Sequence, residues 1–317
     1  MTTYSLLGYA LRSDLEFPEL RTLSQAEPRW SFRSRPSDAG IPAAVLLREA
    51  TALPCTIRLY RTQGGYWLEH LCTGSYFVSD DGSRIEYQPL PHAYPDAVRF
   101  DLLGRVIALA LHVGGWLCLH GSAVRVGGGV VGFVAPKGYG KSTLASSLVR
   151  AGGQLVSDDL LVIEPGDPAL ALPGVHRLRL RDDSFGSVVL DRCKAERGPD
   201  GKHVISDFPE DRLMTAPARL TAVYCIEPVP PGPGDFVVGR ELLTSPEAAR
   251  ALVSMGKNTA VLDQLEILDA LGRAVQVASQ VPVYRLRVTR DLDQIGAVSN
   301  RLLEWHPSDA LSPTPAG

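Results

Sequence analysis

The sequence predicts a mixed α/β fold built around a phosphate-binding loop, with a smaller β-rich domain ahead of it. An apolar strand, residues 130–134, leads into a turn that contains Gly138 and Gly140 and ends in Lys141-Ser142. A helical pattern follows at once, from Leu144 to Arg150. Strand, glycine-bearing loop and helix in this order are the context in which a chain binds phosphate.

Length and composition indicate a globular protein of about two domains. We place a β-rich domain at residues 1–95, the α/β domain at 96–306 and a disordered tail at 307–317. The formal net charge of −3 provides no broad basic surface, so neither nucleic acid nor a membrane is an expected partner. The N-terminus lacks a signal-peptide pattern, and the most apolar window, 102–119, is interrupted by charge and glycine. We therefore expect a cytoplasmic protein.

The five cysteines are scattered along the chain and show no C-x-x-C spacing. Their odd number and spacing indicate small buried apolar residues, with neither a disulfide framework nor a zinc site. The cysteines are Cys55, Cys72, Cys118, Cys193 and Cys225.

Residues 1–95 are predicted to be β-rich because apolar and polar residues alternate between glycine-bearing turns. The polar, proline-containing segment 29–42 is predicted to be a loop. His70 and His92 are isolated, so this domain shows no catalytic constellation. The predicted strands are 4–11, 56–61, 66–70, 75–79 and 84–88.

Helix and strand signals alternate around the phosphate-binding loop. Apolar residues recur at helical spacing over 97–112, with Asp96 as the predicted cap and Gly114-Gly115 as the stop. The predicted strands in this part of the chain are 116–120, 122–126, 130–134, 154–157 and 160–163.

The remaining sequence predicts three helices, three strands and several loops. Ser245-Pro246-Glu247 is typical of a helix start, with Ser245 as the cap, and Asp291 is predicted to cap a last helix over 292–305. A helix is also predicted over 261–280. The predicted strands are 177–181, 220–227 and 282–289, and the predicted loops are 166–173, 192–204 and 228–233.

The loop chemistry indicates ATP with Mg²⁺. Gly138 and Gly140 let successive backbone N–H groups face an anion, and the new helix adds its positive N-terminal end. Lys141 would reach the β- and γ-phosphates and the Ser142 hydroxyl would ligate Mg²⁺. Ala135 stands where the motif has its first glycine, and a glycine-rich turn with an incidental Lys-Ser is the alternative interpretation. The predicted nucleotide-binding residues are Ala135, Pro136, Lys137, Gly138, Tyr139, Gly140, Lys141, Ser142 and Thr143.

Asp158 and Asp159 follow the strand 154–157 and precede another apolar run. Paired aspartates are normally a turn or a helix cap. Two carboxylates within an extended apolar stretch are costly unless they bind something, so we interpret the pair as functional. His120 ends the strand 116–120, and alone it would be a core histidine more often than a catalytic one.

Three segments together resemble the HPr kinase/phosphorylase catalytic domain: residues 119–124, the loop 135–143 and residues 155–159. The resemblance implies a serine kinase with a phosphate-binding-loop domain akin to that of phosphoenolpyruvate carboxykinase. It also implies that Asp159 takes the proton of the acceptor hydroxyl, supported by His120 and Asp158. Lys141 and Ser142 would hold phosphate and Mg²⁺, with Asp158 as a second metal ligand.

The sequence departs from that family at two places. Thr143 stands where the bifunctional enzymes carry an acid, and the glutamate-arginine-glycine signature that supplies a metal-ligating acid has no counterpart. Residues 177–181, with three arginines on one face, occupy that region instead. These departures argue against phosphorylase activity and against HPr as the target.

The layout looks more like the short HPr-kinase-like proteins encoded with ribosomally made peptides. The segments with this likeness are 7–9, 201–204, 282–286 and 290–291. Members of that group in lasso-peptide pathways phosphorylate a precursor peptide at its C-terminal serine, which the resemblance makes the expected substrate. Because kinases of the wider family are often hexameric, a homo-oligomer is also considered.

We therefore predict an ATP- and Mg²⁺-dependent kinase of a serine on a peptide or small protein. Two alternatives stay open: a nucleotide-binding regulatory or scaffold protein without turnover, and a kinase of a small-molecule alcohol. Basic side chains that would contact phosphate or a peptide carboxylate, or else be solvated surface charge, are Arg177, Arg179, Arg181 and Lys202. Lys257-Asn258-Thr259 is left unassigned.

Overall fold

The chain divides into two compact units. The computed structural model describes residues 1–36, 43–52, 55–187, 193–198, 201–231, 236–257 and 264–307. The first unit comprises Met1–Cys118 and Gly256–Arg273, and the second comprises Leu119–Met255 and Ala274–Gly317. The helical segment that begins at Pro95 thus belongs to the first unit, whereas we expected the second domain to begin there. Residues 308–317 of the predicted tail lie outside the described residues.

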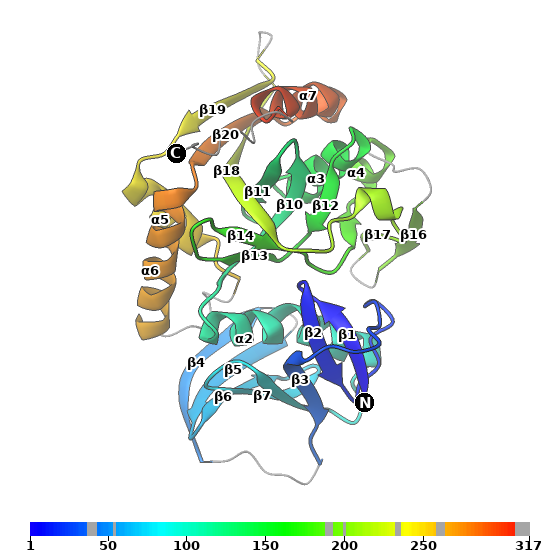
Figure 1. Ribbon diagram of the computed structural model, residues 1–317, viewed down its shortest axis with the longest axis vertical. Coiled ribbons are helices and arrows are strands. Elements are labelled where there is room, and N and C mark those ends of the chain that lie inside the picture. Colours follow the sequence, from blue (N-terminus) through cyan, green and yellow to red (C-terminus); the bar gives the residue numbers. More distant parts are fainter. Residues whose placement is uncertain are drawn as a thin grey trace, which may run out of the picture. The chain divides into compact units, whose positions relative to one another are not determined.

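The first unit contains a sheet in the order β1-β2-β3-β8-β7-β6-β5-β4 (Figure 1). β3 pairs in parallel with β2 and β8, and the other neighbours are antiparallel. Its strands are β1 (Thr2–Leu6), β2 (Tyr9–Ser13), β3 (Pro28–Ser34), β4 (Ala44–Ala52), β5 (Cys55–Thr62), β6 (Gly65–His70), β7 (Gly74–Ser79) and β8 (Arg84–Pro89).

Two predictions for this sheet were wrong. Residues 4–11 form parts of two strands, because Leu7 (φ 55°) and Gly8 (φ 82°) make the hairpin turn between β1 and β2. The predicted loop 29–42 contains most of β3, in which buried Trp30 and Phe32 alternate with polar residues. Residues 37–42 lie outside the described residues.

Cys55 and Cys72 form a disulfide, which contradicts the expectation of unpaired cysteines. The reason is the register of the β5–β6 hairpin, in which Ile57 lies opposite His70. If this pairing continues for two more residues toward the open end of the hairpin, Cys55 lies opposite Cys72. The bond therefore closes the open end of a hairpin, a relation that spacing along the chain does not reveal.

The helical segment of the first unit consists of α1 (Pro95–Asp101), a π-helical stretch (Leu102–Val106) and α2 (Ile107–Val113). The helix begins earlier than predicted: Tyr94 is the N-cap, and Asp96 instead accepts from Arg99 at 2.6 Å. The backbone of Gly82 approaches α2 so closely that a Cβ there would lie 2.1 Å from the Ala110 carbonyl oxygen. Residues 107–112 are all buried.

The second unit is organised around β18, a twelve-residue strand. The sheet order is β12-β10-β11-β18-β14-β13, and β20 pairs with both β18 and β19 (Figure 1). β18 is parallel to β11 and to β20. The strands are β10 (Gly121–Val126), β11 (Gly129–Val134), β12 (Gln154–Ser157), β13 (Leu161–Glu164), β14 (Leu170–Leu172), β18 (Ala218–Val229), β19 (Val238–Leu242) and β20 (Val283–Thr289). β9 (Leu117–Leu119) lies where the chain passes from the first unit to the second.

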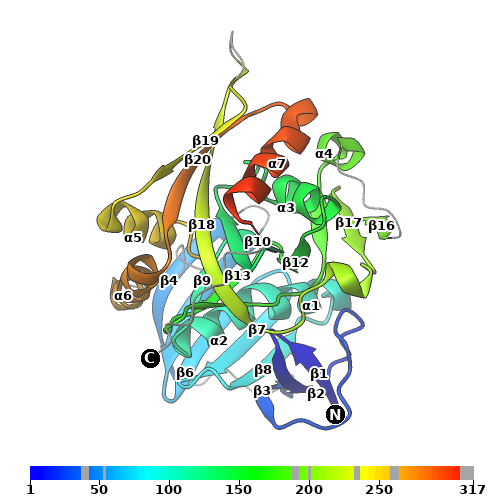
Figure 2. The same cartoon turned by 45° about the horizontal axis from the view of Figure 1, so that its top comes forward.

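Helices α3 (Lys141–Arg150) and α7 (Ile295–Trp305) lie side by side against this sheet (Figure 2). Their apolar residues share one core with Val131 and Phe133 of β11, and the Ser299 hydroxyl donates to Ser147 across the helix pair at 2.7 Å. This packing fixes the axis of α3, and with it the position of the loop that precedes it. The other helices are α4 (Asp182–Ser187), α5 (Ser245–Ser254) and α6 (Gln264–Gln280), which crosses the division between the units.

A small sheet in the order β15-β17-β16 completes the second unit. Its strands are β15 (Leu178–Leu180), β16 (Lys194–Arg197) and β17 (His203–Ser206). β16 and the first two residues of β17 fall in the predicted loop 192–204, and β14 falls in the predicted loop 166–173, so both loop predictions were wrong for these strand residues. β16 is exposed throughout and therefore has no apolar alternation to detect.

Details at the helix starts also differ from expectation. Thr244, not Ser245, caps α5 through a capping box with Glu247. The predicted helix 261–280 is described from Gln264 onward. Asp291 accepts from the Asp293 amide as predicted, although the chain first makes a 3₁₀ turn, Leu292–Gln294, before α7. Among the described residues, no helix has the length and apolarity to cross a membrane.

Two histidines make the stability of the fold sensitive to acid. Burial lowers the pKa of His112 in the first unit and of His306 in the second, each to about 4. Arg273 donates to His112 Nδ1 at 3.0 Å, and His306 Nε2 lies 2.7 Å from the Tyr224 hydroxyl. Both interactions suit a neutral ring.

We predict that stability falls as the pH drops from about 6.5 toward 4. In that range the unfolded chain binds more protons than the folded one, because the folded pKa values are depressed. The double variant His112→Gln/His306→Gln should lose less of its urea midpoint between pH 7 and pH 5 than the unaltered protein. An equal loss in both proteins would show that these histidines do not cause the sensitivity.

Candidate functional site

The segment predicted to bind phosphate has the order of strand, glycine-bearing loop and helix that the sequence predicts. Strand β11 is buried throughout and delivers the chain to Ala135, and α3 begins at Lys141. Gly138 and Gly140 have φ values of 91° and 89°, a conformation that side-chain-bearing residues rarely adopt. Among the described residues no side chain caps the start of α3. The loop therefore curls around amides at a helix N-terminus, which is a suitable place for an anion.

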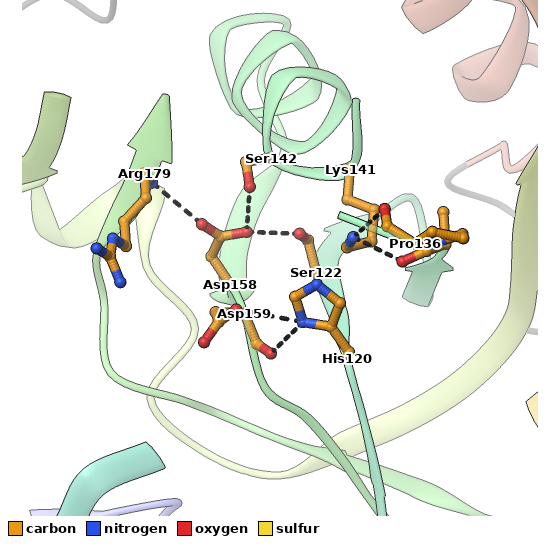
Figure 3. Close-up of polar contacts among 9 residues, drawn as sticks. His120, Ser122, Pro136, Lys141, Ser142, Asp158, Asp159 and Arg179 are labelled. Atoms are coloured by element: carbon orange, nitrogen blue, oxygen red, sulfur yellow. Dashed lines mark hydrogen bonds and ion pairs between the residues drawn. The ribbon is translucent and has the colours of Figure 1, made fainter. Parts of the chain in front are cut away.

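Lys141 is folded back over the loop. Its ammonium donates to the carbonyl oxygens of Ala135 at 2.7 Å and Pro136 at 3.0 Å (Figure 3). The side chain is buried, with 6% of the residue exposed. A buried ammonium requires acceptors, and the loop carbonyls supply them. The positive charge is thereby held at the concave side of the loop.

Asp158 joins the loop helix to two strands. Its Oδ1 accepts hydrogen bonds from the hydroxyls of Ser122 at 2.5 Å and Ser142 at 2.8 Å, and its Oδ2 accepts from the Arg179 amide at 3.1 Å (Figure 3). Burial raises the pKa of the Asp158 carboxyl above its ordinary value, while the two hydroxyl donors oppose that rise. The negative charge is thus solvated by dipoles rather than by a cationic side chain.

Asp159 turns out of strand direction immediately after Asp158. Its φ of 68° places it in the left-handed region, so the pair is a turn and not the extended stretch that we expected. Because of this turn, the carboxylates of Asp158 and Asp159 point in different directions. Asp159 Oδ1 lies 3.2 Å from His120 Nδ1, and the two side chains are 37% and 29% exposed, respectively. The His120 amide donates to the Met255 carbonyl at 2.7 Å, which fixes the backbone that carries the ring.

The structure therefore brings together His120, Lys141, Ser142, Asp158 and Asp159, which the sequence places in three separate segments (Figure 3). The arginines of 177–181 are partly buried or exposed, as expected opposite buried Leu178 and Leu180. The backbone amide of Arg179 donates to Asp158 Oδ2 and so connects this strand to the site. Lys202 lies just ahead of β17 in the second unit, and Lys257 belongs to the first unit.

Ser122 is the residue of this site that sequence reasoning missed. It is fully buried in β10, yet its side chain is polar and donates to Asp158. The available signal was a serine two residues after His120 inside an apolar strand. A buried hydroxyl normally has a hydrogen-bond partner, so a buried serine at this position predicts a hydrogen-bond acceptor nearby.

The donor set fits a magnesium ion. Mg²⁺ in nucleotide sites takes one or two protein oxygens and completes its shell with phosphate oxygens and water. Ser142 and Asp158 supply a hydroxyl and a carboxylate within 2.8 Å of each other. Among the described residues, no group of three or more His, Cys, Asp and Glu side chains could hold a metal.

Comparison by sequence finds no matching protein-family model and no similar curated protein. Among solved structures, the chain is similar to the Hpr(Ser) kinase/phosphatase from Coxiella burnetii, with 12% sequence identity and a TM-score of 0.30. That likeness covers 59% of this chain and 98% of the other. Likeness at this level says nothing of activity or substrate.

We predict that Gly140→Ala weakens ATP binding about 5- to 30-fold, because the free loop of the variant would leave the left-handed conformation and binding would have to restore it at a cost of about 1–2 kcal/mol. A Cβ at Gly140 would meet no atom within 4 Å, so the effect would come from the backbone and not from a clash. Calorimetric titration with ATP measures it. The matched control is Gly272→Ala in α6, where a Cβ also meets nothing within 4 Å. The control should leave ATP affinity unchanged, and equal affinity in the Gly140 variant would contradict the loop assignment.

Proposed function

We propose that this chain is an ATP-dependent kinase that transfers the γ-phosphate to a serine hydroxyl. The observation that supports this proposal most is that two adjacent aspartates contact two different parts of the site. Asp158 is hydrogen-bonded to the loop residue Ser142, and the adjacent Asp159 is paired with His120. A nucleotide-binding protein without chemistry has no need of the second pair.

The loop side of the site would bind ATP. Lys141, the loop amides and the N-terminus of α3 would hold the phosphates and stabilise the charge that spreads over the γ-phosphoryl oxygens during transfer. Ser142 and Asp158 would hold Mg²⁺, which neutralises phosphate charge when bound. Lys141 already makes two hydrogen bonds to loop carbonyls, and in the complex it would exchange them for phosphate oxygens.

Asp159 would act on the acceptor. Both aspartates are partly exposed. The carboxylate of Asp158 already accepts three hydrogen bonds that hold it toward Ser122, Ser142 and β15, so we assign the substrate hydroxyl to Asp159. With a proton on Nδ1, His120 would donate between the Asp159 backbone carbonyl oxygen at 3.3 Å and the carboxylate oxygen Oδ1 at 3.2 Å, and would thereby orient Asp159. Asp159 then accepts the hydroxyl proton as the oxygen forms its bond to phosphorus. His120 is a positioning residue in this scheme.

The acceptor that we propose is a ribosomally made precursor peptide of the lasso type, phosphorylated at its C-terminal serine. Support comes from the resemblance of the motifs to the short HPr-kinase-like proteins. The arginines at 177, 179 and 181 would offer cations to the terminal carboxylate of such a peptide. The cytoplasmic location stays a prediction, and the Cys55–Cys72 disulfide weighs against it, because disulfides are rare in a reducing cytosol.

We predict that Asp159→Asn reduces phosphoryl transfer by about 10²- to 10⁴-fold while leaving ATP affinity within about threefold. The amide keeps the size of the side chain but cannot take a proton. Lys141→Ala should lose both ATP binding and transfer. Labelled ATP with a serine-bearing peptide measures transfer, and calorimetry measures binding. Full turnover by Asp159→Asn would remove that residue from the role of base.

A peptide that ends in serine should accept label, and the same peptide ending in alanine should not. These two peptides, together with a small alcohol, distinguish the three functions that the sequence left open. Label on neither peptide but on a small alcohol would favour the small-molecule kinase. ATP binding without transfer to any hydroxyl would favour the scaffold.

A further inference from the structure

Ser122 is placed between the two strands that build the nucleotide site. Its strand, β10, pairs with β11 on one side and with β12 on the other, with Ser122 opposite Phe133 and Ala123 opposite Ser157. β11 leads to the phosphate-binding loop, and β12 leads to Asp158. A side chain at position 122 can therefore reach the carboxylate from a strand that belongs to neither the loop nor the aspartate turn.

The hydrogen bonds of Asp158 divide into those that nucleotide binding would change and those that it would not. Ser142 belongs to the loop, and its hydroxyl would have to turn a lone pair toward a metal ion. Ser122 and the Arg179 amide are on strand β10 and strand β15, and they hold Oδ1 and Oδ2, respectively. These two donors fix the plane of the carboxylate whatever Ser142 does.

We propose that Ser122 is the positioning residue that presents Asp158 to the metal ion. This inference rests on the proposed nucleotide site. An ionised carboxylate has about four acceptor positions, and the structure fills three of them, two on Oδ1 and one on Oδ2. One position on Oδ2 remains, and the Oδ1 position that Ser142 fills would open when Ser142 turns toward the ion. The Ser122 hydroxyl and the Arg179 amide would keep the orientation of the carboxylate in both states. Without the Ser122 hydroxyl, the partly buried carboxylate would lose a donor and its fixed orientation.

The effect should appear in the Mg²⁺ dependence of nucleotide binding. Loss of a hydrogen-bond partner behind a metal ligand typically lowers metal affinity about 10- to 100-fold. Ser122 contacts neither the loop backbone nor Lys141 in the described hydrogen bonds, so metal-free nucleotide affinity should stay the same. A general packing defect would weaken binding with and without the metal.

The test uses Ser122→Thr and Ser122→Val, which add the same volume but differ in the hydroxyl. The affinity of a non-hydrolysable ATP analogue is measured by calorimetry in EDTA and across a series of Mg²⁺ concentrations. Ser122→Val should need at least about tenfold more Mg²⁺ for half of the metal-dependent gain. Ser122→Thr should stay within about threefold of the unaltered protein. Ser122→Ala, which adds no volume, should behave as Ser122→Val and covers the case in which the larger side chains disturb folding.

Ser184→Ala is the matched control, since it removes a different buried serine hydroxyl in the same unit, one that donates to the Asp183 carboxylate at 3.1 Å. It should leave the Mg²⁺ dependence unchanged. Equal Mg²⁺ requirements for the Thr, Val and Ala variants would overturn the positioning role. If the unaltered protein did not bind the analogue at any Mg²⁺ concentration, the proposed function would be overturned as well. The same titrations therefore distinguish failure of the positioning role from failure of the proposed function.

Discussion

One carboxylate holds the candidate site together. Asp158 is partly buried, and its charge is stabilised by two serine hydroxyls and one backbone amide from β10, α3 and β15. An ionised group in such surroundings is costly unless each oxygen finds donors. The burial raises the pKa of Asp158, and a divalent cation at this position would remove the cost. The loop, the aspartate turn and strand β15 must therefore keep their places for this one group to stay charged.

The parts of the site that depend on local chemistry could be predicted from the sequence. Positive φ values at Gly138 and Gly140 are a property of the residue type, and the order of strand, loop and helix around them is read directly from the chain. The aspartate pair followed from the cost of two carboxylates beside an apolar run. In the structure both contact other site residues, but with different partners: Asp158 accepts three hydrogen bonds, and Asp159 lies against His120.

The parts that depend on pairing between distant strands could not be predicted. Ser122 reaches Asp158 only because β10 lies between β11 and β12, which no spacing reveals. The disulfide of Cys55 with Cys72 follows from hairpin register in the same way. β3 was misread because its polar and proline residues outweighed the alternation of Trp30 and Phe32. The exposed strand β16 has no hydrophobic pattern at all.

The central claim is that Asp158 couples the phosphate-binding loop to a metal ion. The most direct measurement is ATP affinity of Asp158→Asn in Mg²⁺ and in EDTA, beside the unaltered protein. The account predicts that the unaltered protein binds ATP more tightly in Mg²⁺, and that the variant binds it equally in both. Retention of the full metal-dependent gain by Asp158→Asn would contradict the claim.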